Sequence, residues 1–317
     1  MYKYIIKRIL TLIPVLFIVS VFIFMLIHMI PGDPARTMLG ELATEEEVQA
    51  LREQMGLNDA LPVQYVRWLG GLFTGNLGQS VFINEPMSNI IFEHLGPTLL
   101  LTFYSLIFAV LIALPLGIIA AKKRGSIADQ TISTFSMIGI SIPSFLLGLF
   151  LVMIFAVKLR ILPVGGYKPI GEYGFAANFK YMLLPSIALG LMDAGLLIRM
   201  TRSSVLDVLD SDYVKMARAK GVKEFFIICK HSLRNAMLPI LTAIGQAMIG
   251  LLSGAAVVES VFNIPGIGQL VVNSVNRRDY EVIQIIVLFT TLINILVCLI
   301  IDILYGVFDP RVRVGKN

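Results

Sequence analysis

The sequence is short of the residues from which most soluble catalytic sites are built. Charged residues fill 15% of its 317 positions, and there are two cysteines, three histidines and one tryptophan. Cys229 falls in a basic segment and Cys298 in an apolar run, so we expect no disulfide and no cysteine-based metal cluster. The phosphate-binding G-x-x-x-x-G-K-[ST], the nucleophile elbow and HExxH are also missing. We therefore expect no enzyme, no cofactor and no bound nucleotide in this chain.

Apolar residues are what the sequence has in abundance. They make up 56% of it, and the mean hydropathy is +0.82. These values lie outside the range of soluble proteins and indicate a polytopic membrane protein. The net charge of +5 would suit nucleic acid or a membrane surface. Because the basic residues are unevenly shared between the segments that separate the apolar runs, we interpret the partner as the lipid bilayer and not as nucleic acid.

The fold class predicted from these runs is an all-α membrane protein with six transmembrane helices. The first run follows a basic start and is too long for the apolar core of a signal peptide, so we interpret it as an uncleaved span. A kink is expected at Pro143, inside the third span. In order, the predicted spans cover residues 9–30, 97–121, 131–157, 181–198, 239–260 and 282–306.

Lysine and arginine counts predict the orientation of these spans. The segments on the side of the N-terminus hold 17 of these residues, and the segments on the other side hold 9. Because basic loops stay in the cytoplasm, both termini are expected to be cytoplasmic. The chain then divides into residues 1–30 with the first span, an extracytoplasmic cap segment at 31–96, and a five-span core at 97–317 with a basic cytoplasmic loop at 199–238.

The cap segment carries signals of local folding. Thr44 and Glu47 have the spacing of a capping box and predict a helix that Gly56 ends. Tyr65 and Trp68 are large rings that need burial. We therefore expect a small folded unit at 31–96 and not an unstructured loop.

A short helix is predicted inside the basic loop. Asp212 puts negative charge at its start, Arg218 puts positive charge near its end, and Gly221 is a suitable stop. Ala217 and Ala219 give it a wall of small side chains. The helix is too short to cross a bilayer, so it should lie at the membrane surface, where it could dock into a groove on another protein. The alternative is an ordinary basic loop.

Four polar side chains in or near the spans are candidates for function. Asp193 lies well inside the fourth span, where a carboxylate either lines a path or bonds to a neighbouring helix. Glu259, at the outer end of the fifth span, is a second pathway candidate, although its position favours an interfacial charge that reaches water. His28 and His94 flank the cap segment and could share a soft divalent metal, but two histidines without further ligands are more often packing residues.

The basic loop resembles the coupling-helix motif, or EAA loop, of permease subunits of ABC importers. Its form, Y-V-x-x-A-R-A-x-G followed by L-R-N-A-x-x-P, is similar to the peptide and nickel branch. Lys215 stands where the wider family has a glutamate, and this departure weakens any claim that a carboxylate carries the coupling. The matching residues are Tyr213, Val214, Ala217, Arg218, Ala219, Gly221, Leu233, Arg234, Asn235, Ala236 and Pro239.

Further segments extend this resemblance from end to end. They are similar to the B-type permease subunit of the dipeptide, oligopeptide and nickel ABC importers. Glu281 departs from that pattern, in which proline is common at this position, and Asp193 is not part of it. The segments are PGDPA at 31–35, LPVQYVRWLGGL at 61–72, GNLGQS at 75–80, VVESVFNIPGIGQL at 257–270, NRRDY at 276–280 and FDPRVR at 308–313.

The resemblance implies the permease fold of type I ABC importers in a prokaryotic inner membrane. It also implies a second homologous permease, an extracytoplasmic substrate-binding protein, and two cytoplasmic ATPase subunits that use ATP and Mg²⁺. The coupling residues it implies are Asp212, Tyr213, Ala217, Arg218, Ala219 and Gly221.

The function that this resemblance implies is import of dipeptides or oligopeptides, driven by ATP. Nickel or a metal chelate is the alternative substrate. A secondary transporter or channel that works alone is a rival, but such proteins usually show paired broken spans or several buried charges. A membrane anchor for a partner ATPase, without transport, is a second rival.

Overall fold

The computed structural model describes residues 2–29, 33–40, 43–78, 80, 85–227, 232–277 and 279–308, and every regular element in these ranges is helical. Cys229, residues 31–32, Arg278 and residues 309–313, which the sequence analysis used, lie outside them. The helices are α1 (Tyr2–Met29), α2 (Pro34–Leu39), α3 (Glu45–Met55), α4 (Leu61–Thr74), α5 (Met87–Lys122), α6 (Ile127–Ser141), α7 (Ser144–Leu151) with the π-helical η1 (Val152–Lys158), α8 (Ile170–Leu209), α9 (Asp212–Ala219), α10 (Glu224–Phe226), α11 (Leu233–Phe262), α12 (Ile267–Arg277) and α13 (Tyr280–Phe308).

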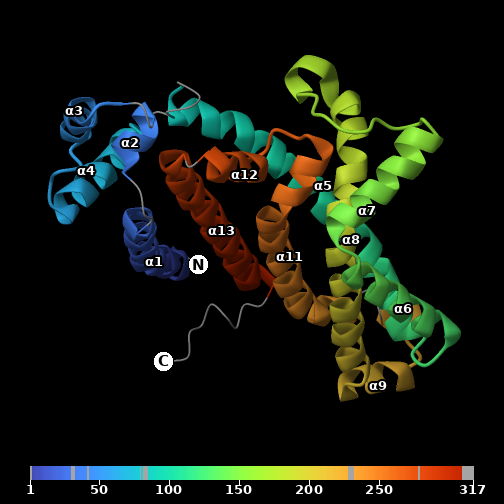
Figure 1. Cartoon of the computed structure of the whole chain (residues 1–317). Coiled ribbons are helices and arrows are strands. Elements are labelled where there is room, and N and C mark those ends of the chain that lie inside the picture. The colour runs from blue at the N-terminus through green and yellow to red at the C-terminus, as the bar shows by residue number, and fades with distance from the viewer. Residues whose placement is uncertain are drawn as a thin grey trace.

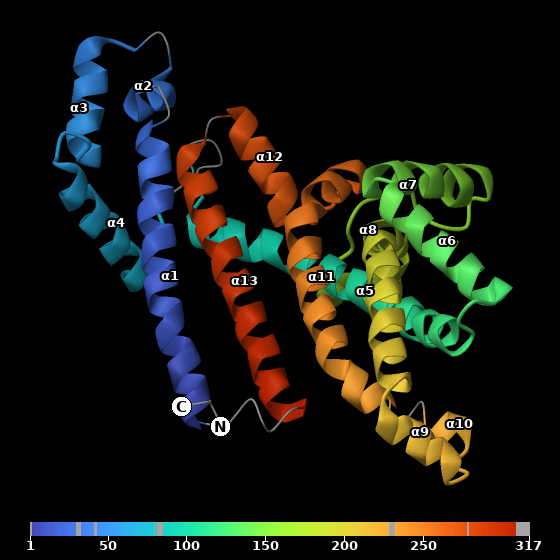
Figure 2. The ribbon, with the colours of Figure 1, turned by 90° about the horizontal axis from the view of Figure 1, so that it is seen from below.

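The long helices stand in a row (Figures 1 and 2). Helix α8 packs against α5, α6, α7 and α11. Helices α1, α13, α11 and α8 run side by side, while α5 crosses the row at a slant and packs along α8. Helix α6 lies on the other side of α8. Helix α9 lies at the same ends of the long helices as the start of α1 and the end of α13, at the bottom of Figure 2, and α3 lies near the opposite ends. We call these the α9 end and the α3 end.

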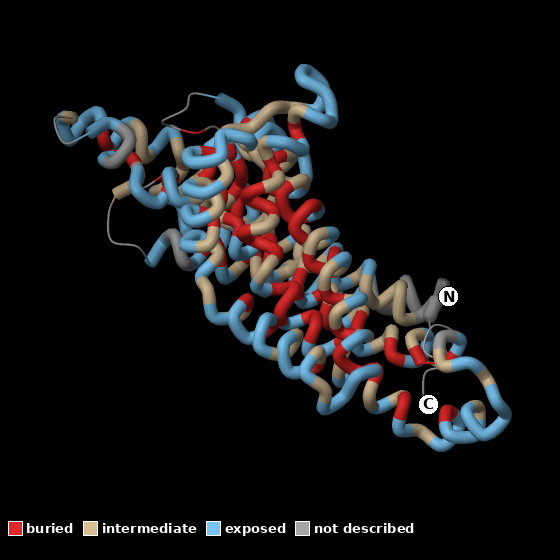
Figure 3. The backbone as a smooth tube through the Cα atoms, turned by 90° about the vertical axis from the view of Figure 1, so that its right-hand side faces the viewer, coloured by how far each residue is buried: buried red, intermediate tan, exposed pale blue. Residues whose placement is uncertain are grey.

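Close packing around α8 depends on glycine at two contacts. A Cβ at Gly190 would lie 2.5 Å from the carbonyl oxygen of Ser105 on α5, and one at Gly195 would lie 2.5 Å from the carbonyl oxygen of Ser136 on α6. Without those side chains the three backbones approach closely, as small residues allow in membrane helices. Buried residues accordingly gather along the middle of the bundle, while both ends are exposed (Figure 3).

Among the residues that the structure describes, four helices are long and apolar enough to cross a bilayer: α5, α8, α11 and the part of α13 at Tyr280–Tyr305. They contain the predicted spans at 97–121, 181–198, 239–260 and 282–306. Helix α5 begins well before its predicted span because Met87, Ile90 and Ile91 recur at helical spacing and pack against α12 and α13. The apolar part of α1 with described side chains, Ile9–Met25, is by itself shorter than a full span, so a count of six spans stays a prediction.

The third predicted span needs a correction. The break falls at the expected place, because Ile142, just before Pro143, has an extended backbone and ends α6. The two halves, Ile127–Ser141 and Ser144–Lys158, meet at 100°, so they can form the predicted third span only as a broken span and not as one kinked helix. Residues 127–158 thus form two helices that turn at Pro143.

Three helices, α2 to α4, lie within the predicted cap segment. Thr44 caps α3 and forms the predicted capping box with Glu47, and Gly56 follows with a left-handed backbone. The Tyr65 ring centroid lies 5.4 Å from that of Phe24 on α1, and the Tyr65 hydroxyl lies 2.8 Å from Ser20 Oγ. Tyr65 and Trp68 are half-buried, and both contact Phe24 of α1. That residues 31–96 form a folded unit of their own stays a prediction, as does their place outside the cytoplasm.

Candidate coupling and translocation sites

Helix α9 is the short helix that the basic loop predicted. It begins at Asp212 after the N-cap Ser211, whose hydroxyl donates to the Val208 carbonyl and makes no capping bond. Lys215 donates a hydrogen bond of 2.9 Å to Asp212, and this bond lowers the pKa of the Asp212 carboxyl. Gly221, with φ of 78°, ends the segment in the left-handed region, where a side chain would be strained.

One face of α9 is built into the core. Val214 is fully buried in a cluster that joins the α9 ends of three long helices, and Ala217 is partly buried against it. A displacement of α9 must therefore move those helix ends together. The cluster consists of Ala121, Val205, Leu209, Val214, Ile227, Ala236 and Ile240.

The opposite face of α9 points away from the bundle. Tyr213 is 45% exposed and Met216 is 61% exposed, and Ala219 is exposed beside them. An exposed methionine on a short surface helix is a usual docking contact, because its side chain adapts to a partner. Sequence reasoning missed Met216, which is exposed, and included Ala217, which the structure packs against the buried cluster.

Two polar contacts fix α9 to its neighbours. Arg218 donates to both carboxylate oxygens of Glu224 on α10, at 3.2 and 2.8 Å, and these bonds lower the pKa of the Glu224 carboxyl. The Asn235 side chain donates to the Tyr213 hydroxyl at 2.6 Å. Arg218 and the Tyr213 hydroxyl are therefore engaged within the chain. The face left for a partner is formed by Met216, Ala219 and the exposed part of the Tyr213 ring.

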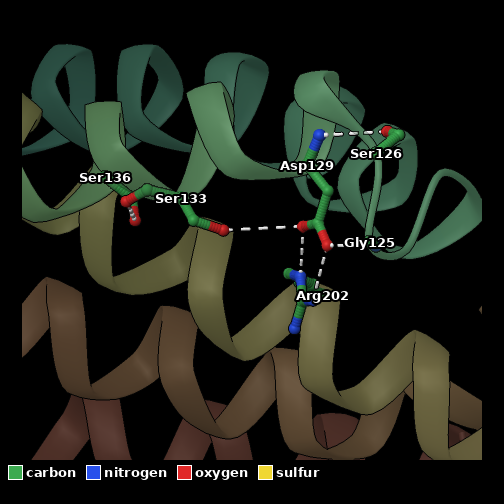
Figure 4. Close-up of polar contacts among 6 residues, drawn as sticks. All are labelled: Gly125, Ser126, Asp129, Ser133, Ser136 and Arg202. Atoms are coloured by element: carbon green, nitrogen blue, oxygen red, sulfur yellow. Dashed lines mark hydrogen bonds and ion pairs between the residues drawn. The ribbon is translucent and has the colours of Figure 1, made fainter.

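A buried ion pair near the α9 end was not predicted. Asp129, 4% exposed in the first turn of α6, receives Nε and Nη2 of Arg202 on α8 at 2.6 and 2.8 Å. The Gly125 amide adds a bond of 2.9 Å and the Ser133 hydroxyl a longer one (Figure 4). In the sequence, Asp129 looks like an ordinary first-turn acidic residue after the N-cap Ser126, so only the fold reveals its partner.

Glu259 is fully buried, so its interpretation as an interfacial charge that reaches water is wrong. Its carboxylate accepts from the Thr98 hydroxyl at 2.7 Å and from the Gln269 amide at 2.9 Å. The Thr98 hydroxyl also accepts from the Ile267 amide at 2.8 Å. Glu259 thus ties α5, α11 and the start of α12 together. A pathway role for it stays untested.

Replacing Thr98 by valine, which has the same shape, is expected to destabilise the protein by about 1–3 kcal/mol. The change leaves the Ile267 amide and one Glu259 oxygen without a partner in a buried place. Thermal unfolding in detergent, compared with the variant Thr131→Val at an exposed hydroxyl, measures it. Equal melting temperatures for the two variants would contradict the proposed bridge.

Asp193 lies on α8 and is 6% exposed. Within the part of the chain that the structure describes, Asp193 makes no hydrogen bond and no ion pair. Buried carboxylates normally have partners, because an unpaired charge is costly to bury. The alternative in which Asp193 bonds to another helix of this chain therefore finds no support in the described residues.

The two histidines of the α3 end are held by their own helices. His28 Nδ1 lies 2.8 Å from the Phe24 carbonyl oxygen, and its Nε2 lies 3.2 Å from Gln64 Oε1. His94 Nδ1 lies 2.7 Å from the Ile90 carbonyl oxygen. Among the described residues, no three His, Cys, Asp or Glu side chains are grouped as metal ligands. The structure thus does not bring the two histidines together as a metal site.

A cleft of about 870 Å³ opens at the α3 end, between the cap helices, α1 and α13. Its walls carry charges of both signs and aromatic rings. Arg67 and Asp59 pair across 2.5 Å on one wall, and Glu281 lines the wall formed by α13. A cleft of this size and mixed lining can take a polar group of a partner or a small solute.

Comparison with known proteins identifies the family. The model described as "Binding-protein-dependent transport system inner membrane component" matches residues 113–314, and the model of its N-terminal part matches residues 1–102. A probable peptide ABC transporter permease protein of Sinorhizobium fredii is 40% identical over 310 residues, 98% of this chain and 99% of the relative. A glutathione transport system permease protein of Escherichia coli strain K12 is 42% identical over 313 residues, 99% of each chain.

Solved structures support the fold. A chain of the MetNI methionine ABC transporter, in an inward-facing conformation, superposes with a TM-score of 0.60 at 21% identity, covering 71% of this chain and 99% of that one. At this identity the likeness concerns the fold alone, which is that of ABC importer permeases. Because the family models and the relatives match nearly the whole sequence, the chain belongs to the family of binding-protein-dependent transport system inner membrane components.

Proposed function

We propose that this chain is the transmembrane permease subunit of an ATP-driven importer for small peptides. The observation that carries the proposal is the near full-length similarity, at 40–42% identity, to a probable peptide permease and to glutathione permeases. Glutathione is itself a small peptide, so both named substrates share one chemistry. The chain would work with a second homologous permease and two ATPase subunits, which use ATP and Mg²⁺.

The ATPase subunits would dock on the exposed face of α9, which places the α9 end in the cytoplasm. Tyr213, Met216 and Ala219 offer this face, and Val214 anchors the other face in the core. Closure of the ATPase groove then displaces the α9 ends of α5, α8 and α11 as one body. If ATP binding favours one packing of these helices, access alternates between the two sides of the membrane.

A substrate-binding protein would deliver the peptide at the α3 end, outside the cytoplasm. The support is the helical cap segment and the cleft beside it, whose charged walls suit polar contacts with a partner. Asp193 would line the path, because it is a buried carboxylate to which the described part of this chain offers no partner. Glu259 would shape the outer end of the path by holding α12 in place.

The test is uptake by the complete transporter in proteoliposomes, with the binding protein outside. We expect ATP-dependent uptake of labelled dipeptide or tripeptide, and competition by unlabelled peptide but not by methionine or nickel. A variant without residues 45–74, which form α3 and α4, should retain its ATPase subunits but lose the uptake that the binding protein stimulates. Uptake of nickel in place of peptide, or full uptake by the shortened variant, would overturn the corresponding part of the proposal.

A further inference from the structure

The α9 end of helix α6 has little apolar burial of its own. Ile127 is 82% exposed, and Gln130 and Thr131 are exposed as well. Helix α6 also contributes nothing to the buried cluster around Val214 that unites α9 with α5, α8 and α11. Two contacts hold this end of α6 to α8: the partly buried Ile132 packs against an apolar cluster to which α8 contributes, and Asp129 pairs with Arg202 (Figure 4). Of the two, the ion pair is the one that fixes orientation.

The other end of α6 leads away from α9. Beyond Ser141 the chain turns through 100° at Pro143 into α7. Helix α7 packs closely on the α3 end of α11, since a Cβ at Gly148 would lie 2.8 Å from the Phe262 ring. Helix α6 therefore connects the region of α9 with the region of Phe262 at the far end of the bundle, with a sharp turn between them.

We propose that Asp129 and Arg202 are positioning residues that make α6 move with α8 when α9 is displaced. The motion would then pass through the turn at Pro143 to α7 and the α3 end of α11. This inference rests on the proposed function, in which ATPase subunits act on α9. It adds a second connection across the membrane, separate from the direct one through α8 and α11.

The chemistry of the pair suits this task. A guanidinium that donates two bonds to one carboxylate fixes orientation as well as distance, which a single bond does not. The Gly125 amide and the Ser133 hydroxyl donate to the same carboxylate, so the connection between α6 and α8, which we call the joint, includes the turn before α6. Asp129 is 4% exposed and the Arg202 side chain is 30% exposed, so water reaches these bonds only from the arginine side.

The chain offers a matched control for this joint. Arg124, in the same turn before α6, pairs with Asp210 at the end of α8 across 3.2 Å. The two side chains are 64% and 71% exposed, and exposed pairs of this kind contribute little. The two pairs thus connect the same segments and differ in burial and geometry.

The experiment uses the complete transporter in proteoliposomes and measures peptide transported per ATP hydrolysed. Asp129→Asn and Arg202→Gln are expected to lower this ratio about tenfold, the effect of losing one hydrogen-bonded charge, while ATP hydrolysis continues. Arg202→Lys keeps the charge but cannot form the bidentate contact. Its ratio of peptide to ATP should lie between the ratios of those two variants and that of the wild type. Arg124→Gln should leave the ratio unchanged.

A second measurement reports the joint directly. Spin labels at the exposed positions Ile127 and Asp207, in protein without Cys229 and Cys298, give the distance between α6 and α8 by electron–electron double resonance. The distribution should stay narrow with and without ATP in the wild type and broaden in Asp129→Asn. Unchanged ratio and distribution in that variant, or a lower yield of protein with normal transport per complex, would overturn the proposal. If the wild type itself transports no peptide, the proposed function fails instead.

Discussion

Met216→Glu is expected to abolish uptake and release the ATPase subunits, while the permease still folds. Met216 is 61% exposed on the outer face of α9 and does not belong to the buried cluster behind it. In the docked state its side chain would be desolvated in the partner's groove, where an unpaired carboxylate is strongly unfavourable. A buried contact at the centre of an interface is typically worth about 2 kcal/mol or more, which is about 30-fold or more in affinity.

Co-purification of the ATPase subunits and uptake in proteoliposomes measure this effect. Met216→Leu keeps the apolar contact and should behave like the wild type. Val214→Ala serves as the opposite control, because Val214 is fully buried and its truncation should lower the melting temperature and leave docking largely intact. If Met216→Glu retained its ATPase subunits and transported normally, the docking face would lie elsewhere on the loop.

Local patterns in the sequence predicted the local structure well. The bounds of α9, the capping box of Thr44 and Glu47, and the break at Pro143 depend on residues only a few positions apart. Such signals act through backbone geometry and helix ends, which do not need the rest of the fold. The apolar runs likewise predicted helices, since composition alone sets what can cross a bilayer.

Features that join distant parts of the chain could not be predicted in this way. The partner of Asp129 lies 73 positions away, and the partner Thr98 of Glu259 lies 161 positions away. Its place at the end of a predicted span suggested that the Glu259 side chain is exposed. The sequence could not correct this, because the packing of α12 over the carboxylate leaves no periodic pattern. The faces of α9 are an intermediate case. Apolar and polar residues both occur in the sequence of α9, but which side meets the core depends on the α9 ends of α5, α8 and α11.

Asp193→Leu is expected to make the protein more stable and the transporter less active. Within the described residues the carboxylate has no partner, so removing it relieves the cost of burying a polar group, about 1–3 kcal/mol by mutational data. Uptake should fall at least about tenfold if Asp193 makes a charge-assisted contact with the moving substrate. Thermal unfolding and uptake in proteoliposomes measure the two effects on the same preparation.

Asn178, on the same helix, supplies the matched comparison, because it is equally buried and fully partnered. Its amide donates to the Lys168 carbonyl at 2.7 Å, and its oxygen accepts from the Tyr104 hydroxyl at 3.1 Å. Asn178→Leu leaves the Lys168 carbonyl and the Tyr104 hydroxyl unpaired. It should lower the free energy of unfolding by about 1–3 kcal/mol, opposite in sign to Asp193→Leu. If both changes destabilise, Asp193 has a partner outside this chain, such as the second permease, and its role is in assembly. A rise in stability together with a loss of uptake is the result that only a residue of the path would give, because it trades folding free energy for a contact with the substrate.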